Sequence, residues 1–128
     1  MNRPIKFRAW DKEGNCFYYS SGQPNVDFIF GKMGDGVYIG GLLRIDLTDE
    51  NTNQFTGLKD KSGVEIYEGD ILSVKIRGSR RVLPGEVAQH LSGTWIVGEG
   101  GDLWHFNKRC EVIGNFYENP ELLTKEVK

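Results

Sequence analysis

One stretch of nineteen residues, 54–72, constrains the fold more than any other part of the sequence, because it contains two turn signals and the start of a strand. Its segment Asp60–Gly63 is typical of a type I turn closed by a left-handed glycine, the usual connection of a short β-hairpin. The segment Glu68–Asp70 then interrupts the chain before an apolar run that begins at Ile71. The stretch therefore predicts antiparallel strands joined by tight turns.

The N-terminal segment has a similar pattern. Apolar Ile5, Phe7 and Ala9 alternate with other side chains, which predicts a half-buried strand whose basic face points outward. A turn at 11–14 should return the chain into an aromatic strand at 16–20. Residues 11–18 align without a gap to residues 60–67, so the chain contains either two hairpins with the same turn or a coincidence of common turn residues.

The region between these hairpins is less regular. Residues 26–30 form a short strand candidate, and residues 37–47 are apolar and β-branched enough for a second one. Gly40 and Gly41 in its middle predict a bulge or bend, and a short helix over 41–47 is the alternative. The polar segment 47–52 is the expected boundary between residues 1–52, an N-terminal β-hairpin region, and residues 53–128.

The second region predicts a small SH3-like β-barrel. Short apolar segments separated by turns give its expected strands, at 71–77, 82–91, 94–97, 103–106 and 110–117, with Pro84 and Gly85 breaking the start of the second. Asn119 and Pro120 are typical of a helix N-cap and first position, so a short helix should follow over 122–126. The predicted fold class is all-β, with one short C-terminal helix.

Length and composition limit the protein's class. A chain of 128 residues fits one domain, or one domain with a small appendage, and its net charge of −2 does not indicate wholesale capture of nucleic acid. No stretch approaches the roughly 20 apolar residues of a membrane helix, and no apolar signal core follows the basic N-terminus, so we expect a cytoplasmic protein. Cys16 and Cys110 have no metal-binding spacing and are expected to be reduced thiols.

The residues that carry chemistry give weak signals for catalysis or metal binding. Glu86 and His90 lie on one face of a predicted strand, but they are more typical of a solvent-facing pair than of a catalytic one. The carboxylates of Asp60, Glu68 and Asp70 are a conceivable divalent-cation site, although turn residues account for all three. We therefore expect no catalytic residues, no metal site and no cofactor. Four aromatic residues were considered as a base-stacking surface and are more typical of core positions: Trp10, Tyr18, Tyr19 and Trp95.

One basic segment suggests a nucleic-acid interface. Four cations occur within residues 75–81, on an otherwise slightly acidic chain. The candidate phosphate-binding residues are Lys75, Arg77, Arg80 and Arg81. A charged turn that keeps a hairpin soluble is the alternative explanation.

Four segments resemble the YopX family, small proteins of phages and prophages of Gram-positive bacteria. They are 5–11, 55–61, 65–71 and 111–123. The resemblance implies a β-rich fold and a phage origin, and it implies no established activity or catalytic residue.

Together these observations favour a non-enzymatic phage accessory protein that acts by binding a protein partner or by self-assembly. A nucleic-acid-binding barrel is the second hypothesis, and a small hydrolase that uses Glu86 and His90 is the third. Because an isolated hairpin is marginally stable, we expect a homo-oligomer with the hairpin at 6–19 at or near its interface. A phage or host protein is the other expected partner, and no membrane is expected.

Overall fold

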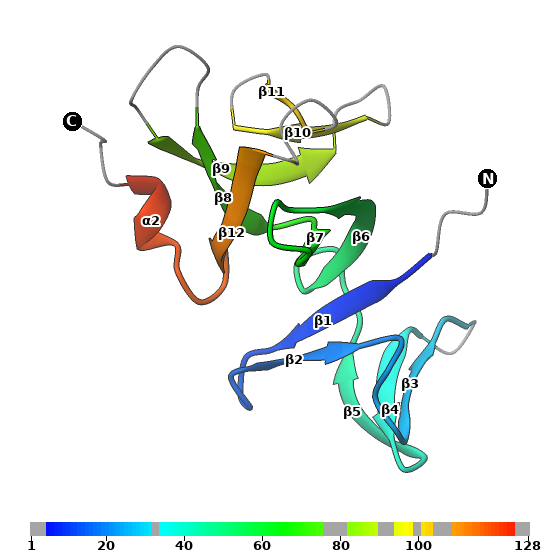
Figure 1. Cartoon of the computed structure of the whole chain (residues 1–128). Helices are drawn as coiled ribbons and strands as arrows, with labels where there is room; N and C mark the ends of the chain where they lie inside the picture. Colours follow the sequence, from blue (N-terminus) through cyan, green and yellow to red (C-terminus); the bar gives the residue numbers. More distant parts are fainter. Residues whose placement is uncertain are drawn as a thin grey trace. The chain divides into compact units, whose positions relative to one another are not determined.

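The computed structural model describes residues 5–31, 34–75, 82–89, 94–98, 101–103 and 109–124 (Figure 1). The described part of the chain is mostly β, with several antiparallel sheets and one short C-terminal helix. The predicted all-β class is confirmed. Contacts divide the chain into two compact units, Met1–Phe55 and Thr56–Lys128, which we call unit 1 and unit 2. The division into domains expected from the sequence, 1–52 and 53–128, stays a prediction.

The described strands and helix follow one another as in Figure 1. Unit 1 contains β1 (Phe7–Asp11), β2 (Cys16–Tyr19), β3 (Val26–Ile29), β4 (Gly36–Ile39), β5 (Leu42–Asp46) and the start of β6 (Thr52–Lys59). Unit 2 contains the rest of β6, then β7 (Glu65–Tyr67), β8 (Asp70–Lys75), β9 (Val82–Gln89), β10 (Trp95–Val97), β11 (Gly101–Asp102), β12 (Cys110–Asn115) and α2 (Glu121–Thr124).

Strand β1 is central in unit 1, because β2 pairs with one of its edges and the start of β6 pairs with the other. The expectation that its basic face points outward is wrong. Arg8 is only 4% exposed, its Nε donates to Asn53 Oδ1 at 3.0 Å, and its guanidinium lies 4.2 Å from the centre of the Phe17 ring. The long Arg8 side chain therefore lies along the sheet, between an amide partner on β6 and an aromatic ring on β2.

Strands β3, β4 and β5 form a separate antiparallel sheet in unit 1, in that order. Gly40 and Gly41 connect β4 to β5 in a two-residue turn, with φ angles of 58° and 84°. Two consecutive positive φ angles are the requirement of a type I′ hairpin turn, which glycine meets without strain. The structure therefore replaces both sequence-based alternatives, a single bent strand or a short helix, with a tight hairpin.

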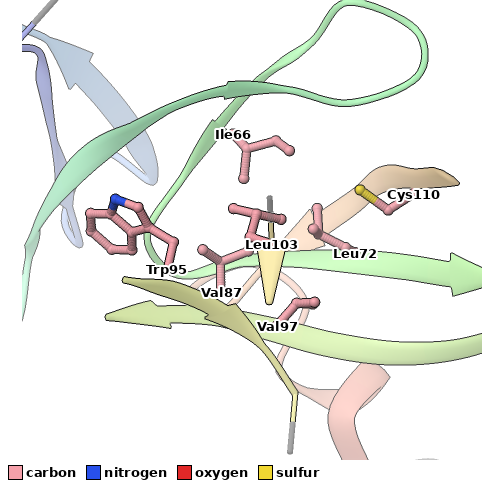
Figure 2. Packing of buried hydrophobic residues seen from close by; sticks show 7 residues of the cluster. All are labelled: Ile66, Leu72, Val87, Trp95, Val97, Leu103 and Cys110. Carbon is pink, nitrogen blue, oxygen red and sulfur yellow. The ribbon is translucent and has the colours of Figure 1, made fainter. Parts of the chain in front are cut away.

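The larger sheet of unit 2 has five antiparallel strands in the order β11-β10-β9-β8-β12 and forms a half-barrel. Apolar side chains of this sheet pack with Ile66 of β7 and with Leu103 in a core cluster (Figure 2). The cluster consists of Ile66, Leu72, Val87, Trp95, Val97, Leu103 and Cys110. The core of the described chain therefore lies mainly in unit 2, as the barrel prediction implies.

The two predicted hairpin turns differ in detail. Gly63 has a φ of 86° and its N–H donates to the carbonyl of Asp60 at 3.0 Å, which confirms the turn at 60–63. If the two turns were equivalent, Gly14 would adopt the same conformation, but Asn15 has the positive φ, 54°, in the first turn. Asparagine tolerates the left-handed region better than most residues with a side chain, so the turn shifts by one residue.

Two further expectations are modified in unit 2. Pro84 and Gly85 do not break the start of β9, because both pair with β8 within one continuous strand. Of the expected strand 103–106, only Leu103 is described, and its side chain is fully buried. The C-terminal helix is present as α2, where the N–H of Leu122 donates to the carbonyl of Asn119 at 3.0 Å.

Candidate interaction surface

The β3–β5 sheet exposes large apolar side chains. In and beside it, Ile29 is 47% exposed, Phe30 55%, Leu42 77% and Leu43 54%, and we call these four residues the apolar patch. Large apolar residues that are exposed singly are ordinary, but a group of them in one small sheet is typical of an interaction site.

The backbone register shows how part of the patch is built. The outer face of the sheet carries Tyr38 opposite Leu43 and Gly36 opposite Ile29. A side chain on Gly36 would begin 2.6 Å from Leu43 Cδ1, so Leu43 extends across the glycine toward the β3 side of the sheet. The opposite, inner face contains the fully buried Val37. Of the patch, Ile29 and Leu43 thus lie on the outer face, which also carries Asp27 and Asp46, whereas Leu42 pairs with Ile39 on the Val37 face.

A polar cluster holds β5 against the first hairpin. Val37 pairs with Ile45 and Tyr38 with Leu43, so Arg44 is the extra residue of a β-bulge. Arg44 Nε donates to Asp11 Oδ2 at 3.2 Å and to the hydroxyl oxygen of Tyr18 at 3.1 Å. The bulge therefore directs Arg44 out of the regular alternation and toward a carboxylate on β1.

Four donors surround the buried Asp11 carboxylate, whose side chain is 3% exposed. The N–H groups of Glu13 and Gly14 donate to Oδ1 at 3.1 and 3.0 Å, while Tyr18 and Arg44 donate to Oδ2. The hydrogen bond from Gly14, aided by the other donors, lowers the pKa of Asp11, and burial raises the pKa of Tyr18. A carboxylate that is saturated with donors and held ionised is a poor general base, so the cluster acts as a structural clamp.

The acidic residues of the turns are also engaged in structure. Asp60 Oδ1 accepts hydrogen bonds from the N–H groups of Ser62 and Val64, and Oδ2 accepts one from Val112 on β12, all at 2.8–2.9 Å. Burial alone would raise the pKa of Asp60, but these backbone donors outweigh it and lower the pKa.

The contacts of Asp70 follow the same pattern, since its Oδ2 accepts the N–H of Tyr67 at 2.8 Å. Within the described ranges, no group of three or more His, Cys, Asp or Glu side chains is placed to hold a metal ion. The turn interpretation of these carboxylates accounts for their observed contacts.

Most residues proposed for catalysis or nucleic-acid binding fall outside the described ranges. Lys75 ends β8, but its side chain is not among those described, and Arg77, Arg80 and Arg81 lie outside the described residues altogether. Their role stays a prediction, as does that of His90. Its proposed partner Glu86 is half-buried, and burial together with the nearby Glu68 raises its pKa.

The remaining candidates divide between core and surface. Trp10 and Trp95 are buried, at 8% and 7% exposure, which favours the core interpretation over base stacking. The cysteines are both free thiols: Cys16 is exposed, and Cys110 is buried with its pKa raised to about 11, chiefly by that burial. Sequence reasoning missed the Asp11–Tyr18–Arg44 cluster, because the local sequence pattern at 42–46 does not predict the bulge.

Comparison with known proteins identifies the family. The family model described as YopX protein matches residues 6–124, nearly the whole chain. The chain belongs to the YopX family. Protein EF1440 from Enterococcus faecalis, known from a crystal structure, is similar over 95% of this chain and 99% of its own, with 30% sequence identity and a TM-score of 0.59. No functionally curated protein matches the sequence.

No helix within the part of the chain that the structure describes is long and apolar enough to cross a membrane. The fold shared with EF1440 supports the architecture, and neither the family description nor that title states a substrate or partner.

Proposed function

We propose that this YopX protein is a non-catalytic phage or prophage accessory protein that acts through protein contacts, in the first place by self-assembly, in the cytoplasm of a bacterial host. The observation that carries the proposal is the apolar patch of unit 1. Covering the outer face would remove the exposed Ile29 and Leu43 from water. Apolar burial is the main driving force of protein association.

The polar chemistry of unit 1 supports a binding role rather than a catalytic one. Asp11 and Arg44 are engaged with each other and with Tyr18, which fixes β5 relative to β1 and β2. A fixed strand presents its exposed side chains, Leu42 and Leu43, with little loss of conformational freedom on binding.

Light scattering and sedimentation velocity at tens of micromolar test the proposal. We expect the wild type to exceed the mass of the 14.5 kDa monomer. Leu43→Asp should shift it toward the monomer, because the substitution places a charge in the patch. Val64→Asp is the matched control, since Val64 is 49% exposed but lies in unit 2, and it should leave the mass unchanged. A monomeric wild type, or equal effects of the two substitutions, would contradict the proposal.

Nucleic-acid binding through the basic segment is a second candidate, supported by the four cations within residues 75–81. Contacts to three or four phosphates would give a salt slope of roughly −3 in a log–log plot of affinity. An anisotropy titration with the wild type and with Arg80→Ala/Arg81→Ala tests it. Absence of binding at low salt, or binding that the double substitution leaves unchanged, would eliminate this candidate.

A further inference from the structure

The outer edges of the sheets differ in how they are protected. On β12, Asp60 accepts the N–H of Val112 and the carbonyl of Cys110 accepts the N–H of Lys61, so a turn covers part of that edge. On β5, the bulge at Arg44 interrupts the regular strand. Side-chain caps and bulges of this kind are how natural proteins keep sheet edges from pairing with other chains.

Strand β3 lacks such devices among the described residues. It is the other outer strand of the three-stranded sheet (Figure 1), and its pairing with β4 is regular from Val26 to Ile29. Its only charged residue is Asp27, and it contains no proline. A regular, mostly apolar edge strand is a template for pairing with another strand.

The register shows which backbone groups of β3 point outward. The N–H of Gly40 donates to the carbonyl of Asn25 at 2.9 Å, so these two residues form a hydrogen-bonded pair of the antiparallel ladder. Such pairs alternate along a ladder, and therefore Asp27 and Ile29 also direct their backbone groups to β4. Val26 and Phe28 direct theirs away from β4, to the open edge.

We propose that β3 pairs antiparallel with β3 of a second copy of the chain, around a two-fold axis at Phe28. This inference rests on the proposed self-assembly and specifies which strands would pair in it. Phe28 and its symmetry mate would exchange two backbone hydrogen bonds, and Val26 would face position 30 of the other copy. The two three-stranded sheets would then form one continuous six-stranded sheet.

Side chains on the inner face favour this register. Val26, Phe28 and Phe30 lie on the same side of the strand, and the Phe30 ring lies 5.7 Å from that of Phe7 although Phe30 is 55% exposed. Pairing at Phe28 brings apolar residues opposite apolar residues, including the exposed Phe30 opposite Val26. Cross-strand pairs of this kind stabilise a sheet.

Charge selects this register over the neighbouring one. An axis at Asp27 would place two carboxylates directly opposite each other, which is destabilising. An axis at Phe28 instead places Asp27 opposite the uncharged Ile29 of the second copy, on the outer face. Centring β3 on Phe28 therefore pairs apolar residues with apolar residues and avoids the like-charge contact of an axis at Asp27.

This arrangement predicts charge effects that packing through the sheet face does not. Ile29→Asp would put a like charge opposite Asp27 of the other copy, whereas Ile29→Lys would put an opposite charge there. The two-fold axis repeats each contact, so the dimer dissociation constants of the two variants should differ by about tenfold. The double variant Asp27→Lys/Ile29→Asp recreates an opposite-charge pair and should recover the affinity lost in Ile29→Asp.

Sedimentation equilibrium of the wild type and these three variants at low ionic strength tests the proposal. Circular dichroism checks that each protein is folded. Tighter association of Ile29→Lys and of the double variant than of Ile29→Asp supports pairing at Phe28. Equal weakening by Ile29→Asp and Ile29→Lys, or no recovery in the double variant, overturns the edge pairing and leaves self-assembly through the sheet face intact. A wild type that stays monomeric throughout overturns both proposals.

Discussion

Units 1 and 2 of this YopX protein pack and cover their strands in different ways. Unit 2 buries a continuous apolar cluster, and the Asp60 turn covers part of the β12 edge. Unit 1 relies more on polar and aromatic contacts, such as Arg8 with Asn53 and the Asp11 cluster, and exposes the apolar patch. Under the proposed self-assembly, unit 2 would be complete within one chain, whereas unit 1 would present a surface for a second copy.

The largest expected effect compares two leucines of the two units. Leu72 is fully buried in the core cluster and Leu42 is 77% exposed. Leu72→Ala should lower the free energy of unfolding by about 2–5 kcal/mol, because it removes apolar contacts and leaves a cavity. Leu42→Ala should change it by roughly 0.5 kcal/mol or less. Chemical denaturation of the monomeric proteins measures both, and similar losses would refute the contrast between the units.

A second prediction concerns the carboxylate that covers β12. Asp60→Ala removes three part-buried hydrogen bonds from backbone N–H groups to a carboxylate and should cost about 2–3 kcal/mol. The comparison with Ser62→Ala controls for the turn itself, since the contact known for Ser62 uses its backbone N–H, which alanine retains. Equal stability of the two variants would show that Asp60 does not hold the edge.

The same residue gives a pH dependence whose sign follows from its lowered pKa. The ordinary Asp pKa of 3.8 lies above that of folded Asp60, so the folded state binds the proton less tightly than the unfolded state does. Its stabilisation is therefore complete above about pH 4 and is lost as the pH falls through the lower, folded value. The stability difference between the wild type and Asp60→Ala should shrink in that acidic range. A difference that stays constant down to pH 2 would contradict the ionised role.

The smallest expected effect tests the hairpin turn between β6 and β7. A side chain on Gly63 would meet no atom within 4 Å, so the cost of substitution comes from its φ of 86° alone. Gly63→Ala should destabilise by about 1 kcal/mol, and Gly63→Val by somewhat more, while Ser62→Ala should have little effect. Thermal unfolding measures these changes, and identical melting temperatures for Gly63→Val and Ser62→Ala would refute the turn assignment.

The turns show how far local sequence predicts this fold. The pattern Asp-x-x-Gly at 60–63 was sufficient to predict the turn, because the contacts of the aspartate side chain and the glycine conformation lie within five residues. The matching segment at 11–14 predicted the hairpin but not which residue adopts the positive φ. Asn15 and Gly14 can both satisfy the turn, and the register of the flanking strands decides between them.

Long-range contacts explain what the sequence pattern did not predict. The alternation at 5–10 suggested an exposed Arg8, but β2 and β6 pair on both sides of β1, and this arrangement depends on residues 45 positions away. The Arg44 bulge likewise depends on the position of Asp11 on another strand. Local propensity therefore predicted where the strands lie. Tertiary pairing determined which polar side chains the strands bury and which apolar side chains they expose.

Hydrogen exchange of the β3 amides at several protein concentrations tests the central claim most directly. If unit 1 is completed by a second copy, protection of Val26 and Phe28 should rise with concentration, because their N–H groups point to the open edge in a single chain. Amides of β8 and β9 in unit 2 should be protected equally at every concentration. Rapid, concentration-independent exchange at Val26 and Phe28, in samples that span the micromolar to millimolar range, would contradict the account.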